Sequence, residues 1–173
     1  MSARPSGSRT RDRLGFVLAA LVPFLFYLRT AAPTVYGLDS AELTTGAYTL
    51  GIVHAPGAPL YLLVGHAFTW LPIGDVGFRL NLLSVCTSAL TAAFLFEIVR
   101  RLTEDTAIAL GTAWFVALTY YVWLGGVAAE LYGPQGCILA ALVLLALEWR
   151  RQRRPWLLVA LAFRLKKPRS VDA

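Results

Sequence analysis

Long apolar runs that end at arginine clusters constrain the fold of this chain more than any other feature. The four clearest runs cover residues 14–28, 80–99, 107–127 and 134–147. Several approach the roughly 20 residues that a helix needs to cross a bilayer. The chain is 57% hydrophobic, whereas soluble domains contain about 45–50% apolar residues. The pattern predicts an all-α integral membrane protein, a multi-pass transmembrane helix bundle with four full spans.

The two ends of the chain differ from this apolar centre. Residues 1–13 are rich in Ser, Arg, Pro and Gly, which predicts a disordered basic tail. Residues 14–163 form the predicted transmembrane domain, and its last part, 156–163, begins a fifth span. That stretch covers roughly 12 Å of a hydrocarbon core about 30 Å thick, so the fifth span is incomplete. Residues 164–173 form a polar tail, and we expect a truncated or altered C-terminus there.

The first apolar run has a second interpretation. A basic start followed by a short apolar run also describes a cleaved signal peptide. More hydrophobic segments follow it, which favours an uncleaved membrane anchor.

The positive charge indicates how the helices are oriented. The net charge is +6, and arginines gather before the first run, at 100–101 and at 150–154. Because they cap apolar helices instead of forming one stripe, nucleic-acid binding is not expected. Such clusters mark cytoplasmic ends, and all three share one side only if the short apolar segment 59–71 does not cross the membrane. We therefore predict a cytoplasmic N-terminus and a first outer loop on the non-cytoplasmic face, with helices lying along the membrane.

Chemical candidates gather in that first outer loop, in the stretch GLDSAELTTGAYTLGIVHAPGAPLY. Asp39 and Glu42 fit a capping box, with Asp39 as the N-cap and Glu42 as its partner. They also fit catalysis, since a partly desolvated carboxylate can act as a base. The two interpretations are compatible, because a capped helix would hold both carboxylates in place. His54 precedes a rigid Pro-Gly turn and is either an exposed loop residue or a contact for an anionic group.

Four more residues are expected on the same outer face. Arg79 is either an interfacial anchor or a clamp for a phosphate, whose oxygens a guanidinium matches, and Asn81 lies beside it. Glu130 and Tyr132 follow in the loop GGVAAELYGP, and an acid at the membrane surface is a functional candidate. No cofactor is expected. Two carboxylates could hold a divalent cation, but nothing in the sequence requires a metal.

Four motifs, DSAE, HAPGAPLY, RLNLLS and AELYGPQG, occur in this order. Together they resemble a family of multi-pass proteins long of unknown function, which includes the vertebrate O-mannosyltransferase of plexin-type receptors. The likeness covers about residues 30–160 and places the chain with the GT-C glycosyltransferases. It implies a GT-C-like transmembrane domain at 14–163, or its N-terminal part, with the catalytic acid in the first outer loop.

The resemblance also implies a reaction. A sugar such as mannose would pass from a polyprenyl-phosphate donor in the membrane lipid to a hydroxyl of a protein or glycan acceptor, with inversion. Asp39 would be the catalytic base and Glu42 its acidic neighbour, while His54, Arg79 and Asn81 match further motif positions. The alternative is a non-catalytic membrane fragment, an assembly subunit or a lipid-phosphate-binding module. A transporter fits less well, because charged groups are absent from the middle of the spans.

Overall fold

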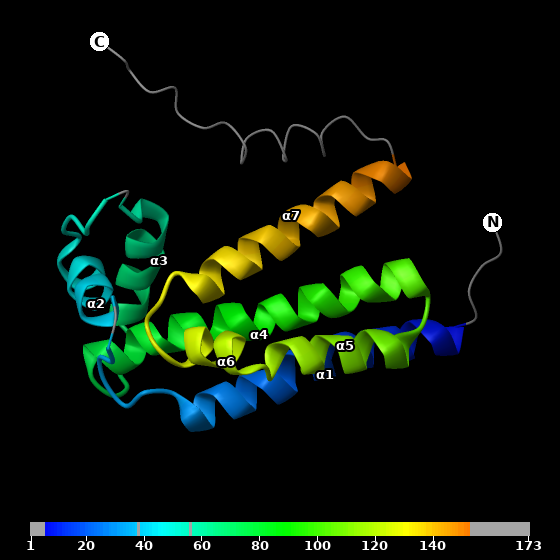
Figure 1. Ribbon diagram of the computed structural model, residues 1–173, viewed down its shortest axis with the longest axis horizontal. Helices are drawn as coiled ribbons and strands as arrows, with labels where there is room; N and C mark the ends of the chain where they lie inside the picture. The colour runs from blue at the N-terminus through cyan, green and yellow to red at the C-terminus, as the bar shows by residue number, and fades with distance from the viewer. Residues whose placement is uncertain (1–5, 38, 56, 153–173) are drawn as a thin grey trace, which may run out of the picture.

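Figure 1 shows the computed structural model, which describes residues 6–37, 39–55 and 57–152. Within these ranges the chain forms only helices and no strand, which confirms the predicted all-α class. In chain order the helices are α1 (Ser6–Thr30), α2 (Ser40–Thr49), α3 (Pro59–Thr69), α4 (Val76–Thr103), α5 (Thr106–Ala117), α6 (Tyr120–Val127) and α7 (Tyr132–Gln152). The expected fifth span at 156–163 and the tail at 164–173 lie outside the described residues.

Helix α4 forms the centre of the bundle. It packs against α1, α5, α6 and α7, and Figure 1 shows α1, α5 and α7 running alongside it. Its buried face carries small residues such as Ala89, Ala92 and Ala93 next to the fully buried Phe96. Small residues let helices approach closely, and close packing is what holds helices together in a bilayer.

Among the described residues, three helices are long and apolar enough to cross a membrane, in α1, α4 and α7, and α5 with α6 makes a fourth if that bent pair is one span. The multi-pass bundle is thereby confirmed. The predicted disorder of residues 1–13 differs from the structure, in which α1 begins at Ser6. Asp12 explains the difference, because its carboxylate is held by Arg100 at 3.1 Å and by the hydroxyl of Thr106 at 2.9 Å. Residues 1–5 lie outside the described part.

The predicted third span, 107–127, is not one straight helix. Helices α5 and α6 meet at 67°, because Thr119 takes an extended conformation with φ −66° and ψ 148°. The end of α5 leaves carbonyls to be satisfied from outside the helix, and the hydroxyl of Tyr27 in α1 donates to the carbonyl of Ala117 at 2.6 Å. The indole N–H of Trp123 donates to the hydroxyl of Thr30 at 2.9 Å. Two hydrogen bonds to α1 therefore support the bend.

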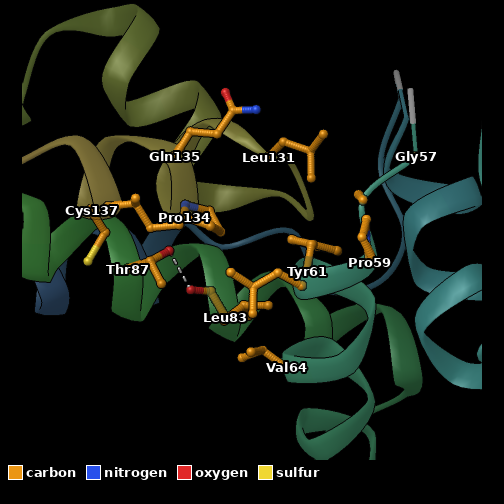
Figure 2. A pocket seen from close by; sticks show the side chains of 13 residues that line it. Gly57, Pro59, Tyr61, Val64, Leu83, Thr87, Leu131, Pro134, Gln135 and Cys137 are labelled. Atoms are coloured by element: carbon orange, nitrogen blue, oxygen red, sulfur yellow. Dashed lines mark hydrogen bonds between the residues drawn. The ribbon is translucent and has the colours of Figure 1, made fainter. Parts of the chain in front are cut away.

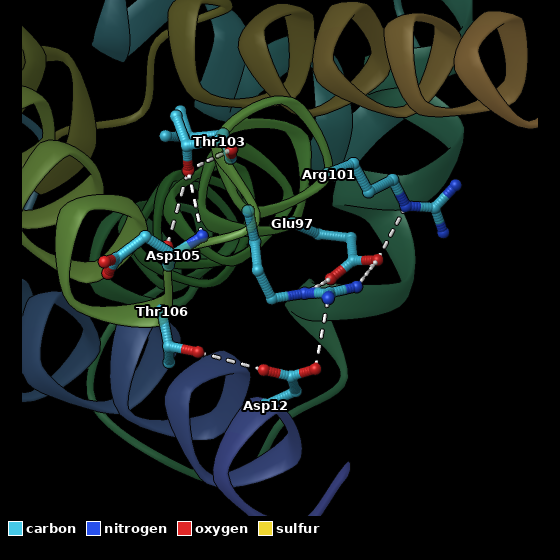
Figure 3. A network of polar contacts seen from close by, with 8 residues as sticks. Asp12, Glu97, Arg101, Thr103, Asp105 and Thr106 are labelled. Carbon is cyan, nitrogen blue, oxygen red and sulfur yellow. Dashed lines mark hydrogen bonds and ion pairs between the residues drawn. The ribbon is translucent and has the colours of Figure 1, made fainter. Parts of the chain in front are cut away.

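The described arginines of the predicted clusters lie at one end of the bundle. Glu97 of α4 bonds Arg100 at 2.7 Å and Arg101 at 2.6 Å (Figure 3). Arg101 also reaches Glu148 of α7 at 2.5 Å, and Arg100 reaches Asp12 of α1 at 3.1 Å. One network of charged side chains therefore ties α1, α4 and α7 together at this end.

The short helices α2 and α3 lie at the opposite end, with α3 running across the bundle (Figure 1). Helix α3 has 11 residues, so it covers about 16 Å, roughly half of the hydrocarbon core. Helix α3 is not among the described helices that are long enough to span, and the membrane topology of segment 59–71 stays a prediction. The two helices pack closely at Gly65, where an added Cβ would lie 3.1 Å from the Cβ of Ala47 in α2 and 2.8 Å from Leu80 in α4.

Candidate active site

Asp39, Glu42 and His54 form one exposed group, here called the acid–histidine cluster. Asp39 directly precedes α2, Glu42 lies in the first turn of α2, and His54 follows in the α2–α3 connection. The Nδ1 atom of His54 lies 2.6 Å from Oε2 of Glu42, and its Nε2 atom lies 3.9 Å from Oδ2 of Asp39. The side chains are about half exposed, 52% for Asp39 and His54 and 43% for Glu42. An imidazole therefore lies between two carboxylates at the protein surface.

The capping box considered for the start of α2 is not formed. Asp39 occupies the N-cap position, but with φ −82° and ψ 0° its side chain makes no capping hydrogen bond, since a capping side chain usually needs an extended residue. Glu42 accepts instead from the backbone N–H of His54 at 2.6 Å, in addition to the imidazole. The carboxylate of Glu42 thus binds the next loop and not its own helix end.

The turn that was predicted after His54 is present. The N–H of Gly57 donates to the carbonyl of His54 at 2.8 Å. Gly57 has a φ of 78°, a left-handed conformation that glycine adopts without the steric cost of a side chain. The turn reverses the chain directly after His54 and so leads it into α3.

The close pairing changes the acidity of both partners. The hydrogen bond to Glu42, and then the negative charges of Glu42 and Asp39, raise the pKa of His54. The imidazole and backbone N–H groups of His54 lower the pKa of Glu42. Both shifts favour the charged forms, an imidazolium for His54 and a carboxylate for Glu42.

Glu130, from the α6–α7 connection, reaches the same place from another part of the chain. Its side chain is only 5% exposed, and its carboxylate accepts a hydrogen bond from the backbone N–H of Asp39. Its own N–H lies 3.3 Å from the hydroxyl oxygen of Ser84 in α4. Burial and then the negative charge of Asp39 raise the pKa of Glu130. The structure therefore brings Glu130 beside Asp39, as the topology argument expected.

Asn81 supports the cluster from inside the bundle. It is fully buried, and its amide donates to the carbonyls of Ala32 at 2.8 Å and Thr34 at 2.9 Å. The hydroxyl of Thr34 also donates to Asp75, the N-cap residue of α4. These bonds hold the α1–α2 connection, which leads to Asp39, against α4. In the structure Asn81 thus positions the backbone, and its predicted substrate contact stays a prediction.

Arg79 and Tyr132 have different surroundings. The guanidinium of Arg79 donates to the backbone carbonyls of Thr69 at 2.7 Å, Ile73 at 2.9 Å and Gly74 at 3.0 Å. These bonds close the α3–α4 connection, and a role for Arg79 as a phosphate clamp stays a prediction. Tyr132 begins α7 with an exposed side chain, and its predicted substrate contact likewise stays a prediction.

An apolar pocket of about 440 Å³ adjoins the cluster (Figure 2). Its walls include Tyr61 and Val64 of α3, Leu83 and Thr87 of α4, and Pro134 and Ile138 of α7. The turn that carries His54 continues into Gly57 and Ala58, which also line the pocket, as does Leu131, the neighbour of Glu130. Apolar walls from three helices suit a hydrocarbon group better than a charged one.

Sequence reasoning missed Tyr61 as a functional candidate. Its side chain is 6% exposed and lines the pocket, and its hydroxyl has no hydrogen-bond partner among the described residues. Burial and then the charge of the nearby Glu130 raise its pKa. A signal was present, because Tyr61 ends the HAPGAPLY motif, but a tyrosine in an apolar run is typical of an ordinary core position.

The acid–histidine cluster is also the place where a cation could bind. One ligand atom from each of Asp39, Glu42 and His54 lies within 4.8 Å of the others, and carboxylates with imidazole are ligands that divalent metals accept. The Nδ1 atom of His54 already donates its proton to Glu42 at 2.6 Å. A metal bound to that nitrogen would have to displace the proton. The residues therefore fit a hydrogen-bonded ion pair as well as a metal.

The fold is that of a multi-pass membrane protein, with short helices across one end of its bundle. A polar cluster beside an apolar pocket forms a candidate active site at that end. Residues 39–165 match the family model described as the Protein O-mannosyl-transferase TMEM260 N-terminal domain. The chain belongs to this family. The matched segment starts at Asp39 and contains the whole acid–histidine cluster, Glu130 and Tyr61.

Two curated relatives carry the same name. The chain is 34% identical to Protein O-mannosyl-transferase TMEM260 of Mus musculus over 114 residues, which cover 65% of this chain and 16% of the relative. It is 23% identical to Protein O-mannosyl-transferase tmem260 of Dictyostelium discoideum over 132 residues, 75% of this chain and 16% of the relative. The aligned region thus covers about a sixth of each relative, 16% of its length. No solved structure matches the chain.

Proposed function

We propose that this chain carries the catalytic-acid region of a GT-C-type O-mannosyltransferase. In this reaction mannose passes from a polyprenyl-phosphate donor to a hydroxyl of a protein or glycan acceptor, with inversion at the anomeric carbon. One observation carries the proposal: a polar cluster with the half-exposed carboxylate of Asp39 adjoins an apolar pocket at one end of a membrane bundle. The names of the two relatives support the transferred group and the enzyme class.

The chemistry follows from the side chains in the cluster. Asp39 takes the proton of the acceptor hydroxyl as its oxygen attacks the anomeric carbon. The bond from that carbon to the phosphate oxygen breaks, and the polyprenyl phosphate leaves with the electron pair. The cationic imidazole of His54, 3.9 Å from Asp39, stabilises the negative charge on the departing phosphate. A single displacement inverts the anomeric centre, and Glu42 keeps His54 charged.

The positions of the arginines and of the acid–histidine cluster also favour one orientation of the protein in the membrane. Arg100 and Arg101, with their partners on α1 and α7, lie at the end of the bundle opposite to the cluster (Figure 1), and positive ends are generally cytoplasmic. The cluster would then act on the non-cytoplasmic face, at the boundary between water and lipid. There the pocket can hold the isoprenoid chain while the acceptor approaches from water.

Transfer of labelled mannose tests the proposal directly. The 173-residue chain is reconstituted in lipid with polyprenyl-phosphate mannose and a Ser/Thr-containing acceptor peptide. We expect Asp39→Asn to lower transfer by a factor of about 100 or more, since a positioned base contributes that much. Glu104→Gln, an exposed acid after α4 at the other end of the bundle, is the matched control and should transfer normally.

A second candidate function is favoured by the small share of the relatives that the chain covers, 16% of their length. The chain would then be a lipid-phosphate-binding module or an assembly subunit, and the remaining region of the enzyme would complete the active site. Saturable binding of the donor lipid without any mannose transfer would favour this function. Equal mannose transfer by the wild type and by Asp39→Asn would show that Asp39 is not the catalytic base.

A further inference from the structure

Two buried polar atoms lie between the acid–histidine cluster and the apolar pocket. They are the hydroxyl of Tyr61 and Oε1 of Glu130, and neither has a hydrogen-bond partner among the described residues. Their side chains are almost fully buried. A buried polar group without a partner costs free energy of order 1–3 kcal/mol, so such atoms are usually paired with water or with a ligand.

The positions of these two atoms indicate which ligand they could bind. The carboxylate of Glu130 accepts a hydrogen bond from the backbone N–H of Asp39, so it adjoins the cluster. Tyr61 lines the pocket, and burial and then the negative charge of the nearby Glu130 raise the pKa of its hydroxyl. Tyr61 at the wall of the pocket and Glu130 beside Asp39 therefore connect the pocket to the cluster. A donor lipid with its chain in the pocket and its reactive carbon near Asp39 would place its sugar ring near these two residues.

The chemistry of the pair selects a kind of ligand. A phenol hydroxyl both donates and accepts a hydrogen bond, and a carboxyl oxygen accepts one from a hydroxyl group. A carboxylate repels a phosphate, which carries the same sign of charge, whereas it binds a neutral polyol well. The two groups therefore suit sugar hydroxyls and not the phosphate, which is better placed against His54.

We propose that Tyr61 and Glu130 form a polar subsite that binds hydroxyl groups of the donor sugar. This inference rests on the proposed function, since it assigns the sugar part of the donor to residues beside the proposed base. It makes the two residues contributors to recognition of the sugar, in addition to the pocket that holds the lipid.

A comparison of two lipids tests the subsite separately from the pocket. Binding of polyprenyl-phosphate mannose and of polyprenyl phosphate is measured for the reconstituted 173-residue chain. We expect the mannose-bearing lipid to bind about tenfold more tightly, because two hydrogen bonds to the sugar together contribute about that factor. In Tyr61→Phe and in Glu130→Gln the difference between the lipids should shrink toward twofold, while polyprenyl phosphate binds as before.

Matched controls are Tyr48→Phe, an exposed tyrosine in α2, and Glu104→Gln at the other end. Both should keep the tenfold preference. Should Glu130→Gln fail to fold, Tyr61→Phe carries the test alone. The inference is overturned if wild type binds both lipids equally, which would assign the unpartnered atoms to water, or if the variants weaken both lipids by the same factor. Failure of wild type to bind either lipid would instead count against the proposed function.

Discussion

Glu42 accepts two hydrogen bonds from His54, one from the backbone N–H and one from the imidazole, each at 2.6 Å. Both bonds act on one carboxylate, so the position and the protonation of His54 are coupled. In this arrangement the Nδ1 proton of His54 is directed at Glu42. The geometry keeps Nε2 directed toward Asp39, 3.9 Å from its carboxylate oxygen.

This coupling predicts the titration of His54. Because its pKa is raised in the folded protein, the charged form stabilises the fold below the ordinary value of 6.5 and this contribution is lost as pH rises through the raised value. The contribution of Glu42, whose pKa is lowered, is present above its ordinary value of 4.5 and is lost as pH falls through the lowered value. The pair should therefore be intact between the two shifted values.

Histidine NMR titration in nanodiscs checks this prediction. The midpoint for His54 should lie above 6.5, and Glu42→Gln should move it down. His66 supplies the second histidine signal, and Glu104→Gln is the control variant that should leave the His54 midpoint unchanged. A midpoint for His54 that does not respond to Glu42→Gln would contradict the pairing.

Chelation should have little effect on the cluster. The proton on Nδ1 of His54 competes with a cation for the same carboxylate, so we expect mannose transfer to change by less than about twofold when EDTA is added. Added Mg²⁺ should leave the His54 NMR signals in place. Loss of transfer that a divalent metal restores would show that the ligand atoms within 4.8 Å of one another hold a required ion.

Gly77 is predicted to be essential for the stability of the bundle. An added Cβ would lie 2.4 Å from the backbone nitrogen of Val35 and 2.8 Å from the carbonyl carbon of Thr34, and neither backbone atom can move without displacing the connection to Asp39. We expect Gly77→Ala to lower the free energy of unfolding by about 1–3 kcal/mol. Gly111→Ala is the matched control, since nothing lies within 4 Å of its added Cβ, and its helix should be stabilised by up to about 1 kcal/mol. Denaturation in detergent measures both, and equal effects would refute the contact.

The bend between α5 and α6 should depend on Tyr27. Removing the hydroxyl that donates to Ala117 at 2.6 Å leaves a carbonyl inside the bundle without that donor. We expect Tyr27→Phe to cost about 0.6 kcal/mol and at most about 1.7 kcal/mol, the average and the maximum measured for hydrogen bonds between membrane helices. The exposed Tyr121 of α6 provides the control, and Tyr121→Phe should be neutral in the same unfolding measurement. A neutral Tyr27→Phe would mean that the bend is held by packing alone.

Much of the architecture could be predicted from local patterns. Whether a segment can cross a bilayer depends on the length of its own apolar run. The spans and the short helix at Pro59 could therefore be predicted without knowledge of the fold. The arginine pattern predicted that segment 59–71 does not cross the membrane, and in the structure this segment forms the 11-residue helix α3. The turn at Gly57 was also local, because glycine and proline conformations are intrinsic to those residues.

The tertiary structure decided how the polar groups are used. Glu42 binds His54 instead of forming a capping box with Asp39. The amide of Asn81 donates to two backbone carbonyls of the distant α1–α2 connection. Asp39 and Glu130 became neighbours only because α4 carries both the α1–α2 connection and the α6–α7 connection. The apolar lengths and charged ends of the helices were set by the sequence itself, since each is an interaction of one segment with its solvent. Contacts between residues far apart in the chain were decided by the packing of the helices, since no local sequence pattern indicates which connection will lie against which helix.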